Sequence, residues 1–427
     1  MPQAAPKAPA SAPSTGLLLT GGGARAAYQV GVLEAIADLR QACGAGGEPN
    51  PFPIITGTSA GAINAAALAC GADNFDRAVR RIARVWRQFH ANQVYGADSL
   101  SVMRSGARWL TLVSIGWALA RWRRMRPQSL LDNKPLEKLL VKMVPLVRLP
   151  RLIRKGHLKA LAVTASSYSS GEHVTFFESA EPLKPWVRSQ RKAARERITA
   201  EHLLASSAIP FIFPAQALAV DGHTEYFGDG SMRQSAPLAP AIHLGAERLL
   251  VVGTGRLHEP PRQGQPEPTY PTLAQIAGHA LSNIFLDALG VDVERAQRIN
   301  HTLSLIPPEA RAHSTLRPVD VLMIVPSQRI DDIAARHVTD LPVTMRTMLG
   351  ALGVTSQAGD VRGAALVSYL LFEQAYTREL MDLGRADTLA RRAEVCRFFG
   401  WNDPGTALPP SASDNDNDSD SDSDGFS

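Results

Sequence analysis

The chain reads Ile54-Ile55-Thr56-Gly57-Thr58-Ser59-Ala60-Gly61-Ala62-Ile63 in the stretch that decides its fold. Apolar residues typical of a buried strand run into Gly-x-Ser-x-Gly, and small residues that favour a helix follow. Because a chain with 33 glycines also produces this spacing by chance, the flanking strand and helix carry the argument. We expect Ser59 to lie exposed at the carboxyl end of a strand, on a sharp nucleophile-elbow turn. The other residues of the turn are Gly57, Thr58, Ala60 and Gly61.

A second glycine-rich turn lies about forty residues upstream. Leu17-Leu18-Leu19 predicts a strand, and a helical pattern begins after the turn Gly21-Gly22-Gly23-Ala24-Arg25. Free N–H groups at a helix start bind an anion, which is either a nucleotide pyrophosphate or the oxyanion of an acyl-transfer intermediate. A dinucleotide site needs an acidic residue at the end of the next strand. That strand ends in Thr56-Gly57-Thr58-Ser59, so the sequence favours the oxyanion.

Two Asp-Gly steps compete for the role of general base. Asp229-Gly230 follows a short strand and precedes a helical pattern, which would place a carboxylate at a strand end. Asp221-Gly222 lies between two strand-like runs and predicts a hairpin turn. Asp-Gly is a common turn pair, so spacing alone leaves both aspartates open.

These motifs, in this order, resemble the patatin-like phospholipases. The resemblance covers about residues 16–250 and includes the stretch Ala205–Pro214 ahead of Asp229. It implies a catalytic dyad in which Ser59 is the nucleophile and Asp229 the general base, and it thereby selects Asp229 over Asp221. It also implies an oxyanion hole in the glycine loop. The chain departs from the family pattern at two positions. Ala26 stands where the family often has glycine, and Ser231 stands where glycine or alanine is usual.

The chemistry of such a dyad is feasible without a histidine. A carboxylate with a pKa near ~4 is a weak base in water, and desolvation beside the serine hydroxyl raises its basicity. Backbone N–H groups then stabilise the oxyanion, by on the order of 3–4 kcal/mol for each donor. The N–H groups of Gly22, Gly23 and Ala24 are the expected donors. Arg25 either fixes this loop and the developing charge or is a solvated side chain at the helix start.

The rival serine hydrolase arrangement needs a histidine after the acid. Histidines that follow Asp229 meet that order, yet none lies in a distinctive loop after a strand; His243, for example, falls in a helical pattern. An α/β-hydrolase would also place several strands ahead of its elbow, whereas Ser59 lies close to the first strand. A Ser-His-Asp triad is therefore the weaker hypothesis.

Composition and charge divide the chain into four regions. Residues 1–15 are rich in Pro, Ala and Ser without an apolar signal core, and residues 406–427 repeat Asp and Ser; we expect both to be disordered. Residues 16–250 form the predicted catalytic domain and 251–405 a mainly helical extension, with helices expected at 272–297 and 358–395 and a strand at 319–325. Three widely spaced cysteines indicate reduced thiols, and we expect no metal and no cofactor.

The body of the chain is basic. Six of the 40 carboxylates lie in the tail, so the rest of the protein carries about +11 against a total of +5. Arginines flank a short apolar run between Arg104 and Arg126, which is too short for a bilayer span and holds three tryptophans. It is either an interfacial or mobile lid segment or a structural helix over the acyl pocket. Nucleic acid is a poor partner, since no binding module is present.

We therefore expect a three-layer α/β/α fold with a mostly parallel central sheet and a C-terminal helical extension. The predicted function is that of a serine lipid acyl hydrolase, of phospholipase A, lysophospholipase or esterase type, acting on lipid or fatty-acyl esters in the cytoplasm and at membrane surfaces. A non-enzymatic lipid-binding protein with the same fold is the alternative, and a dinucleotide-binding module the third. The sequence gives no oligomeric state.

Overall fold

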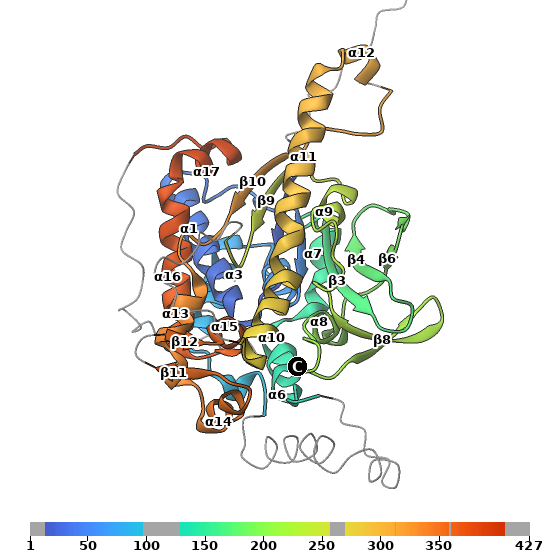
Figure 1. Ribbon diagram of the computed structural model, residues 1–427. Helices are drawn as coiled ribbons and strands as arrows, with labels where there is room; N and C mark the ends of the chain where they lie inside the picture. The colour runs from blue at the N-terminus through green and yellow to red at the C-terminus, as the bar shows by residue number, and fades with distance from the viewer. Residues whose placement is uncertain (1–12, 97–128, 257–269, 312, 358–359, 406–427) are drawn as a thin grey trace, which may run out of the picture.

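The structure is a computed structural model that describes residues 13–96, 129–256, 270–311, 313–357 and 360–405. The predicted acidic tail, most of the predicted N-terminal arm and the apolar run between Arg104 and Arg126 lie outside these residues. Figure 1 shows one sheet through the middle of the molecule with helices on both sides. The predicted three-layer α/β fold with a C-terminal helical region is confirmed.

One large sheet runs through the protein in the order β10-β9-β1-β2-β3-β4-β6-β5. The strands from β10 to β3 are parallel, and β4 turns back antiparallel to β3. The predicted hairpin at Asp221-Gly222 is present as β7 and β8, and β8 also pairs with β3. The strands are β1 Thr15–Leu19, β2 Ile54–Thr58, β3 Ala160–Ser167, β4 His173–Ser179, β5 Val187–Arg188, β6 Arg191–Arg195, β7 Gln216–Val220, β8 His223–Asp229, β9 Arg248–Val252 and β10 Asp320–Ile324.

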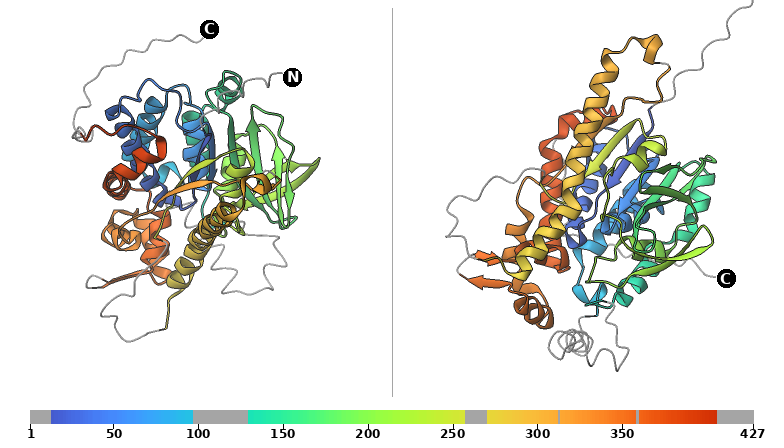
Figure 2. Two further views of the ribbon diagram at one scale, coloured as in Figure 1. Left: turned by 90° about the horizontal axis from the view of Figure 1, so that it is seen from above. Right: turned by 45° about the vertical axis from the view of Figure 1, so that its right-hand side comes forward.

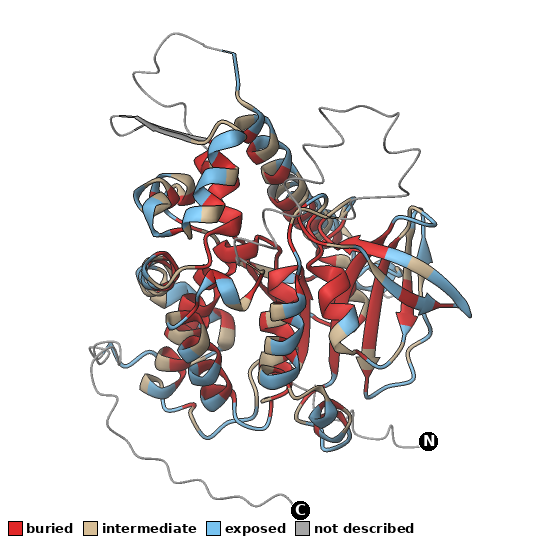
Figure 3. Ribbon diagram, turned by 90° about the horizontal axis from the view of Figure 1, so that it is seen from below, coloured by how far each residue is buried: buried red, intermediate tan, exposed pale blue. Residues whose placement is uncertain are grey.

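Side-chain alternation along the central strands divides the core into two layers. In β1, Leu17 and Leu19 pack with one set of helices, and Leu18 packs with the other, because successive strand residues face opposite sides of the sheet. A strand buried on both faces has a continuous apolar sequence, as Leu17–Leu19 of β1 and Leu249–Val252 of β9 do. Figure 3 shows buried strands and helices whose outer faces are exposed.

The helices on the face of Leu17 and Leu19 include those that follow β1 and β2 in the chain. The helices and helical turns are η1 Gly23–Ala26, α1 Ala27–Ala42, α2 Ala60–Ala69, α3 Phe75–Arg87, η2 Ala91–Gln93, α6 Lys134–Met143, η3 Leu146–Arg148, α7 Leu149–Arg154, α8 Ala200–Ser206, α9 Ala239–His243, α10 Leu273–Ser282, η4 Asn283–Asp287, α11 Ala288–Leu305, α12 Pro308–Arg311, α13 Ile330–Arg336, η5 Val338–Asp340, α14 Val343–Ala351, α15 Ala364–Leu370, α16 Gln374–Ala390 and α17 Arg392–Phe399. The opposite face is covered by α9 and α11, whose buried residues join Leu18.

Strand β3 brings two strand ends together. Thr58, the last residue of β2, pairs with Thr164. Asp229, the last residue of β8, pairs with Ala165, one position further along β3. The parallel strand β2 and the antiparallel strand β8 therefore end beside one another on the same edge of β3. This register places the turn after β2 next to the Asp-Gly step after β8.

The C-terminal region is built into the same body. Strand β10 extends the sheet beyond β9, and α16 packs along α1. The left view in Figure 2 shows the red C-terminal helices beside the blue N-terminal ones. A Cβ at Gly31 of α1 would meet the carbonyl of Met381, so the two helix backbones touch there. The prediction of a helix from residue 358 is wrong at its start: residues 360–362 form strand β12, paired with β11 Thr355–Gln357, and α15 begins at Ala364.

One helical run in the described part, Leu273–Leu305, is long and apolar enough to cross a membrane by length and composition. Its C-terminal helix α11 buries Leu289, Val293 and Ala296 in the core layer that contains Leu18. A core helix passes the same test of length and composition, so this run does not establish a membrane span.

We predict that Gly31→Ala lowers the free energy of unfolding by about 1–3 kcal/mol, because the added methyl group forces α1 and α16 apart. Gly350→Ala in α14 is the matched control: a Cβ there meets nothing within 4 Å, and alanine favours a helix by up to about 1 kcal/mol. Urea unfolding of the two variants measures the difference. A neutral Gly31→Ala would contradict the close approach of the helices.

Candidate active site

Ser59 lies at the junction of β2 and α2 in a strained backbone conformation. Its φ is 55° and its ψ is −133°, which a non-glycine residue rarely adopts and which costs on the order of 1–3 kcal/mol. A Cβ at Gly57 would come within 2.5 Å of the carbonyl oxygen of Gly61, and one at Gly61 would meet the carbonyls of Leu19 and Thr20. Both positions thus require glycine because backbone segments approach closely, and the predicted sharp turn is present.

The expectation that Ser59 is exposed is wrong. The residue is 1% exposed and lies in the wall of a cavity. The Ser59 hydroxyl donates a 2.6 Å hydrogen bond to Oδ2 of Asp229. The turn therefore directs the serine side chain into the protein, towards the carboxylate at the end of β8.

Asp229 is fully buried at the end of β8. Its Oδ1 accepts a 2.8 Å hydrogen bond from the N–H of Ser231. Burial raises the pKa of Asp229 to about 6, although the hydrogen bonds from Ser59 and Ser231 lower it. Because Ser231 makes this contact through its backbone, its departure from the family pattern leaves the contact intact. The carboxylate is consequently a stronger base than an aspartate in water.

Asp221, the competing aspartate, lies elsewhere. It forms the exposed turn between β7 and β8 with a φ of 51°, and its carboxylate accepts a bond from Lys192 at 3.4 Å. The hairpin length separates this turn from the end of β8. Of the two Asp-Gly steps, the structure thus brings only that of Asp229 to Ser59.

Ser206 links the serine turn to the aspartate turn, and sequence reasoning missed it. Its hydroxyl accepts a 2.9 Å bond from the Ser59 N–H and donates a 2.6 Å bond to the Thr164 carbonyl. Its own carbonyl accepts the Gly230 N–H at 3.1 Å. Ser206 lies in the Ala205–Pro214 stretch that resembles the family, which was the available signal for its role.

The glycine loop lies against both turns. Gly23 lines the same cavity as Ser59 and has a φ of 55°, and a Cβ there would meet the Tyr369 carbonyl. The Thr254 hydroxyl donates to the carbonyl of Gly21 and holds the loop to the end of β9. The Arg25 N–H donates a 3.1 Å hydrogen bond to the Gly22 carbonyl. The first N–H groups of a helical turn, in contrast, have no hydrogen-bond acceptor within that turn.

The Arg25 side chain is buried, so the alternative of a solvated arginine is wrong. Nη2 bonds Asp331 of α13 at 2.6 Å, and Nε donates to the Ser368 hydroxyl of α15 at 2.8 Å. The guanidinium also lies 4.0 Å from the ring centre of Tyr369. Arg25 therefore anchors the glycine loop to the C-terminal region. Sequence patterns gave no signal for these partners, because they lie more than 300 residues away.

A buried histidine supports the aspartate turn from behind. His173 Nε2 donates a 2.8 Å hydrogen bond to the Gly230 carbonyl. Burial lowers the pKa of His173 to about 4, so the ring is neutral at physiological pH and keeps the proton on Nε2. Of the later histidines, His243 stacks on Trp186 and His337 bonds Asp340 and Glu379. Within the described residues, no histidine is hydrogen-bonded to Ser59 or Asp229.

An apolar cavity extends from Ser59 between α2, α3 and α6. Its walls carry mostly aliphatic and aromatic side chains, a composition typical of ligand pockets. They include Ile63, Ala67, Ile82, Val85, Trp86, Phe89, Leu136, Leu140, Met143, Ile209, Phe213 and Phe372. The apolar lining of this cavity suits a hydrocarbon chain.

Comparison with family models matches residues 17–242 to the patatin-like phospholipase family. The match covers more than half of the chain, and the protein therefore belongs to this family, whose general class is lipid acyl hydrolase. The fold is similar to VipD from Legionella pneumophila, at 15% identity and a TM-score of 0.32 over 87% of this chain and 67% of that one. It is also similar to the type III effector ExoU, at 16% identity and a TM-score of 0.26 over 91% and 88%. Curated protein sequences give no significant match.

We predict that Ser206→Ala lowers the free energy of unfolding by about 2–3 kcal/mol, because it leaves the buried Ser59 N–H and Thr164 carbonyl without a partner. Ser207→Ala provides the control, since that hydroxyl donates only to the Leu203 and Leu204 carbonyls of the helix that it follows. Its expected loss is below about 1 kcal/mol. Equal losses in urea unfolding would show that Ser206 does not bridge the two turns.

Proposed function

We propose that the protein is a serine lipid acyl hydrolase that uses a Ser59–Asp229 dyad through an acyl-serine intermediate. The observation that carries this proposal is the 2.6 Å hydrogen bond between the two side chains, at the inner end of an apolar cavity. A general base within hydrogen-bond reach of a hydroxyl activates it as a nucleophile. Lipid or fatty-acyl esters are the proposed substrates.

The proposed reaction has two steps. Asp229 removes the proton of Ser59 as Oγ attacks the ester carbonyl, and then gives it to the departing alcohol, which leaves the acyl group on Ser59. Water then attacks the carbonyl of the acyl-serine, and Asp229 takes the water proton and returns it to Oγ of Ser59 as the carboxylic acid leaves. The N–H groups of Gly22, Gly23 and Ala24 would stabilise the oxyanion in both steps, at on the order of 3–4 kcal/mol for each donor.

In this proposal, Arg25 is a positioning residue. Its side chain is bonded to Asp331 and Ser368, which orders the glycine loop without a direct role for the guanidinium at the oxyanion. The proposed catalytic domain of residues 16–250 thus depends on the extension of residues 251–405 for the geometry of its oxyanion loop. The proposed chemistry needs no cofactor or metal.

A fluorophosphonate probe tests the dyad. We expect the probe to label wild-type protein at Ser59, and Ser59→Ala to abolish both the label and esterase turnover. Asp229→Asn should lower kcat by at least about a thousandfold, whereas Asp221→Asn should retain most of the activity. Because asparagine keeps the acceptor for the Ser231 N–H, Asp229→Asn should remain folded.

Two outcomes would overturn the proposal. Equal losses from Asp229→Asn and Asp221→Asn would exclude the dyad. An unlabelled wild-type protein that still binds lipid vesicles would favour the non-enzymatic lipid-binding alternative.

The pH dependence of kcat/KM gives a second test. Asp229 must be ionised to accept the serine proton, and its pKa is raised to about 6. We expect kcat/KM for a soluble neutral ester to fall about tenfold per pH unit below pH 6 and to level off above it. A profile that stays flat down to about pH 4, near the ordinary aspartate pKa, would exclude Asp229 as the base.

We also propose peripheral contact with anionic membranes. The run between Arg104 and Arg126 that first indicated such contact lies outside the described residues, but the outer faces of α3, α6 and α7 support it. These faces carry eight exposed cations without a carboxylate partner among the described residues: Arg77, Arg80, Arg84, Lys138, Lys142, Arg151, Arg154 and Lys155. Val141 and Val147 are 70% and 76% exposed among them.

This basic surface is continuous with the cavity wall. Arg81 of α3 donates a 3.0 Å bond to the Met143 carbonyl of α6, and both residues line the cavity. Arg148 pairs with Asp73, beside the start of α3, at 2.8 Å. Lys and Arg near an anionic bilayer contribute about 1 kcal/mol each, so a surface with this charge would hold the cavity walls at the lipid.

Charge removal tests the membrane contact. We expect Arg80→Gln/Arg84→Gln to weaken binding to phosphatidylcholine vesicles with added phosphatidylglycerol by roughly thirtyfold, since each cation contributes about 1 kcal/mol. The control Arg295→Gln/Arg298→Gln on α11 removes the same net charge and should bind as wild type does. Similar weakening in both variants would mean that only the total charge matters, and would exclude this surface as the contact.

A further inference from the structure

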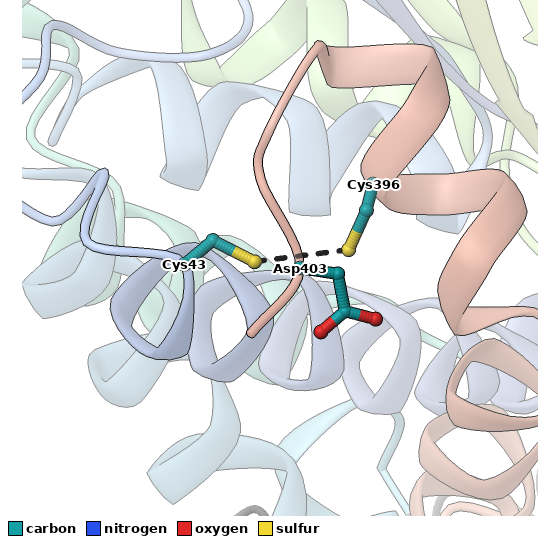
Figure 4. A group of neighbouring side chains, drawn as sticks. All are labelled: Cys43, Cys396 and Asp403. Atoms are coloured by element: carbon teal, nitrogen blue, oxygen red, sulfur yellow. Dashed lines mark hydrogen bonds between the residues drawn. The ribbon is translucent and has the colours of Figure 1, made fainter. Parts of the chain in front are cut away.

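Two cysteines from opposite ends of the described chain meet away from the dyad. Cys43 directly follows α1, and Cys396 lies in α17, 353 residues later. Their sulfur atoms are 3.7 Å apart in a thiol–thiol hydrogen bond. Figure 4 shows the two side chains pointing at one another, with the Asp403 carboxylate beside them.

The two thiols differ in their exposure. Cys43 is partly exposed, whereas Cys396 is buried, so a small reagent in solution reaches Cys43 first. Burial and the Cys43 sulfur raise the pKa of Cys396 to about 12, which keeps its proton in place. The third cysteine, Cys70, is also buried, and burial raises its pKa to about 12. It is a natural control because no other thiol is hydrogen-bonded to it in the described part of the chain.

A bound metal ion is the competing use of this cluster. The ligand atoms of Cys43, Cys396 and Asp403 all lie within 4.8 Å of one another. However, both oxygens of Asp403 accept 2.9 Å hydrogen bonds from Nε of Arg392, and one also accepts the N–H of Gly405. A divalent cation at this point would face a guanidinium group and would have to displace it from the carboxylate.

We propose that Cys43 and Cys396 are a modification site, at which a peroxide-class oxidant forms a disulfide between α1 and α17. The Cys43 sulfur attacks the peroxide O–O bond, which yields a sulfenic acid and one water. The Cys396 sulfur then attacks the Cys43 sulfur and expels hydroxide, which takes the thiol proton and leaves as the second water. Two thiols and one hydrogen peroxide thus give one disulfide and two waters. The sulfur atoms need to close from 3.7 Å to about 2.05 Å.

The bond would fasten the C-terminal region to the first helix of the sheet. It closes a loop of 353 residues, which contains Ser59, Asp229 and the partners of Arg25. Long loops lose the most unfolded-state freedom when they are closed. We therefore expect the oxidised protein to melt at a temperature about 5 °C higher than the reduced protein.

Peptide mapping under non-reducing conditions tests the site. Full-length protein is treated with hydrogen peroxide and unfolded, and its free thiols are counted. The protein is then digested into peptides. We expect the count to fall from three to one, with a peptide that joins Cys43 to Cys396 and disappears on reduction. Cys70→Ser should give the same joined peptide, and Cys43→Ser should give none and lose the shift in melting temperature.

Three outcomes would overturn the proposal. The first is oxidation of Cys43 to sulfinic acid without a joined peptide. The second is a joined peptide that contains Cys70. The third is stoichiometric binding of zinc, added alone to the reduced protein, that protects both Cys43 and Cys396 from alkylation, since the cluster would then be a metal site.

Discussion

The register of strand β3 is the constraint on which the site depends. Thr164 pairs with the last residue of β2, and Ala165 pairs with the last residue of β8. The parallel strand β2 and the antiparallel strand β8 therefore end side by side along β3. A shift of one residue in either pairing would turn every side chain of that strand to the opposite face of the sheet. The Ser59–Asp229 hydrogen bond exists because both registers hold together.

Close backbone contacts lock this arrangement. A Cβ at Gly230 would meet the Thr164 carbonyl, and that same carbonyl accepts the Ser206 hydroxyl. Ser206 and His173 satisfy buried backbone groups of the two turns, which would otherwise cost about 1–3 kcal/mol each. The strained backbone of Ser59 and the buried charge of Asp229 are thus tolerated because the surrounding hydrogen bonds fix both.

The C-terminal region is part of the site's support rather than an appendage to it. It adds β10 to the sheet, lays α16 against α1, and supplies Asp331 and Ser368 to the side chain of Arg25. Because the guanidinium is occupied by these partners, the glycine loop is ordered by residues from the far end of the chain. The same region also contributes Phe372 to the wall of the cavity.

The sequence by itself determined the local elements of the site: the strand, turn and helix around Ser59, the glycine loop, and the hairpin at Asp221. Glycine and apolar patterns encode these elements because each depends on backbone freedom and burial within a few residues. Only the tertiary structure decided that Asp229 reaches Ser59, that Ser206 bridges the turns, that Arg25 is buried, and that Cys43 meets Cys396. The partners in the contacts of Ser59 with Ser206 and Asp229, of Arg25 with Asp331 and of Cys43 with Cys396 lie 147 to 353 residues apart. These contacts follow from strand register and packing, which no local pattern specifies.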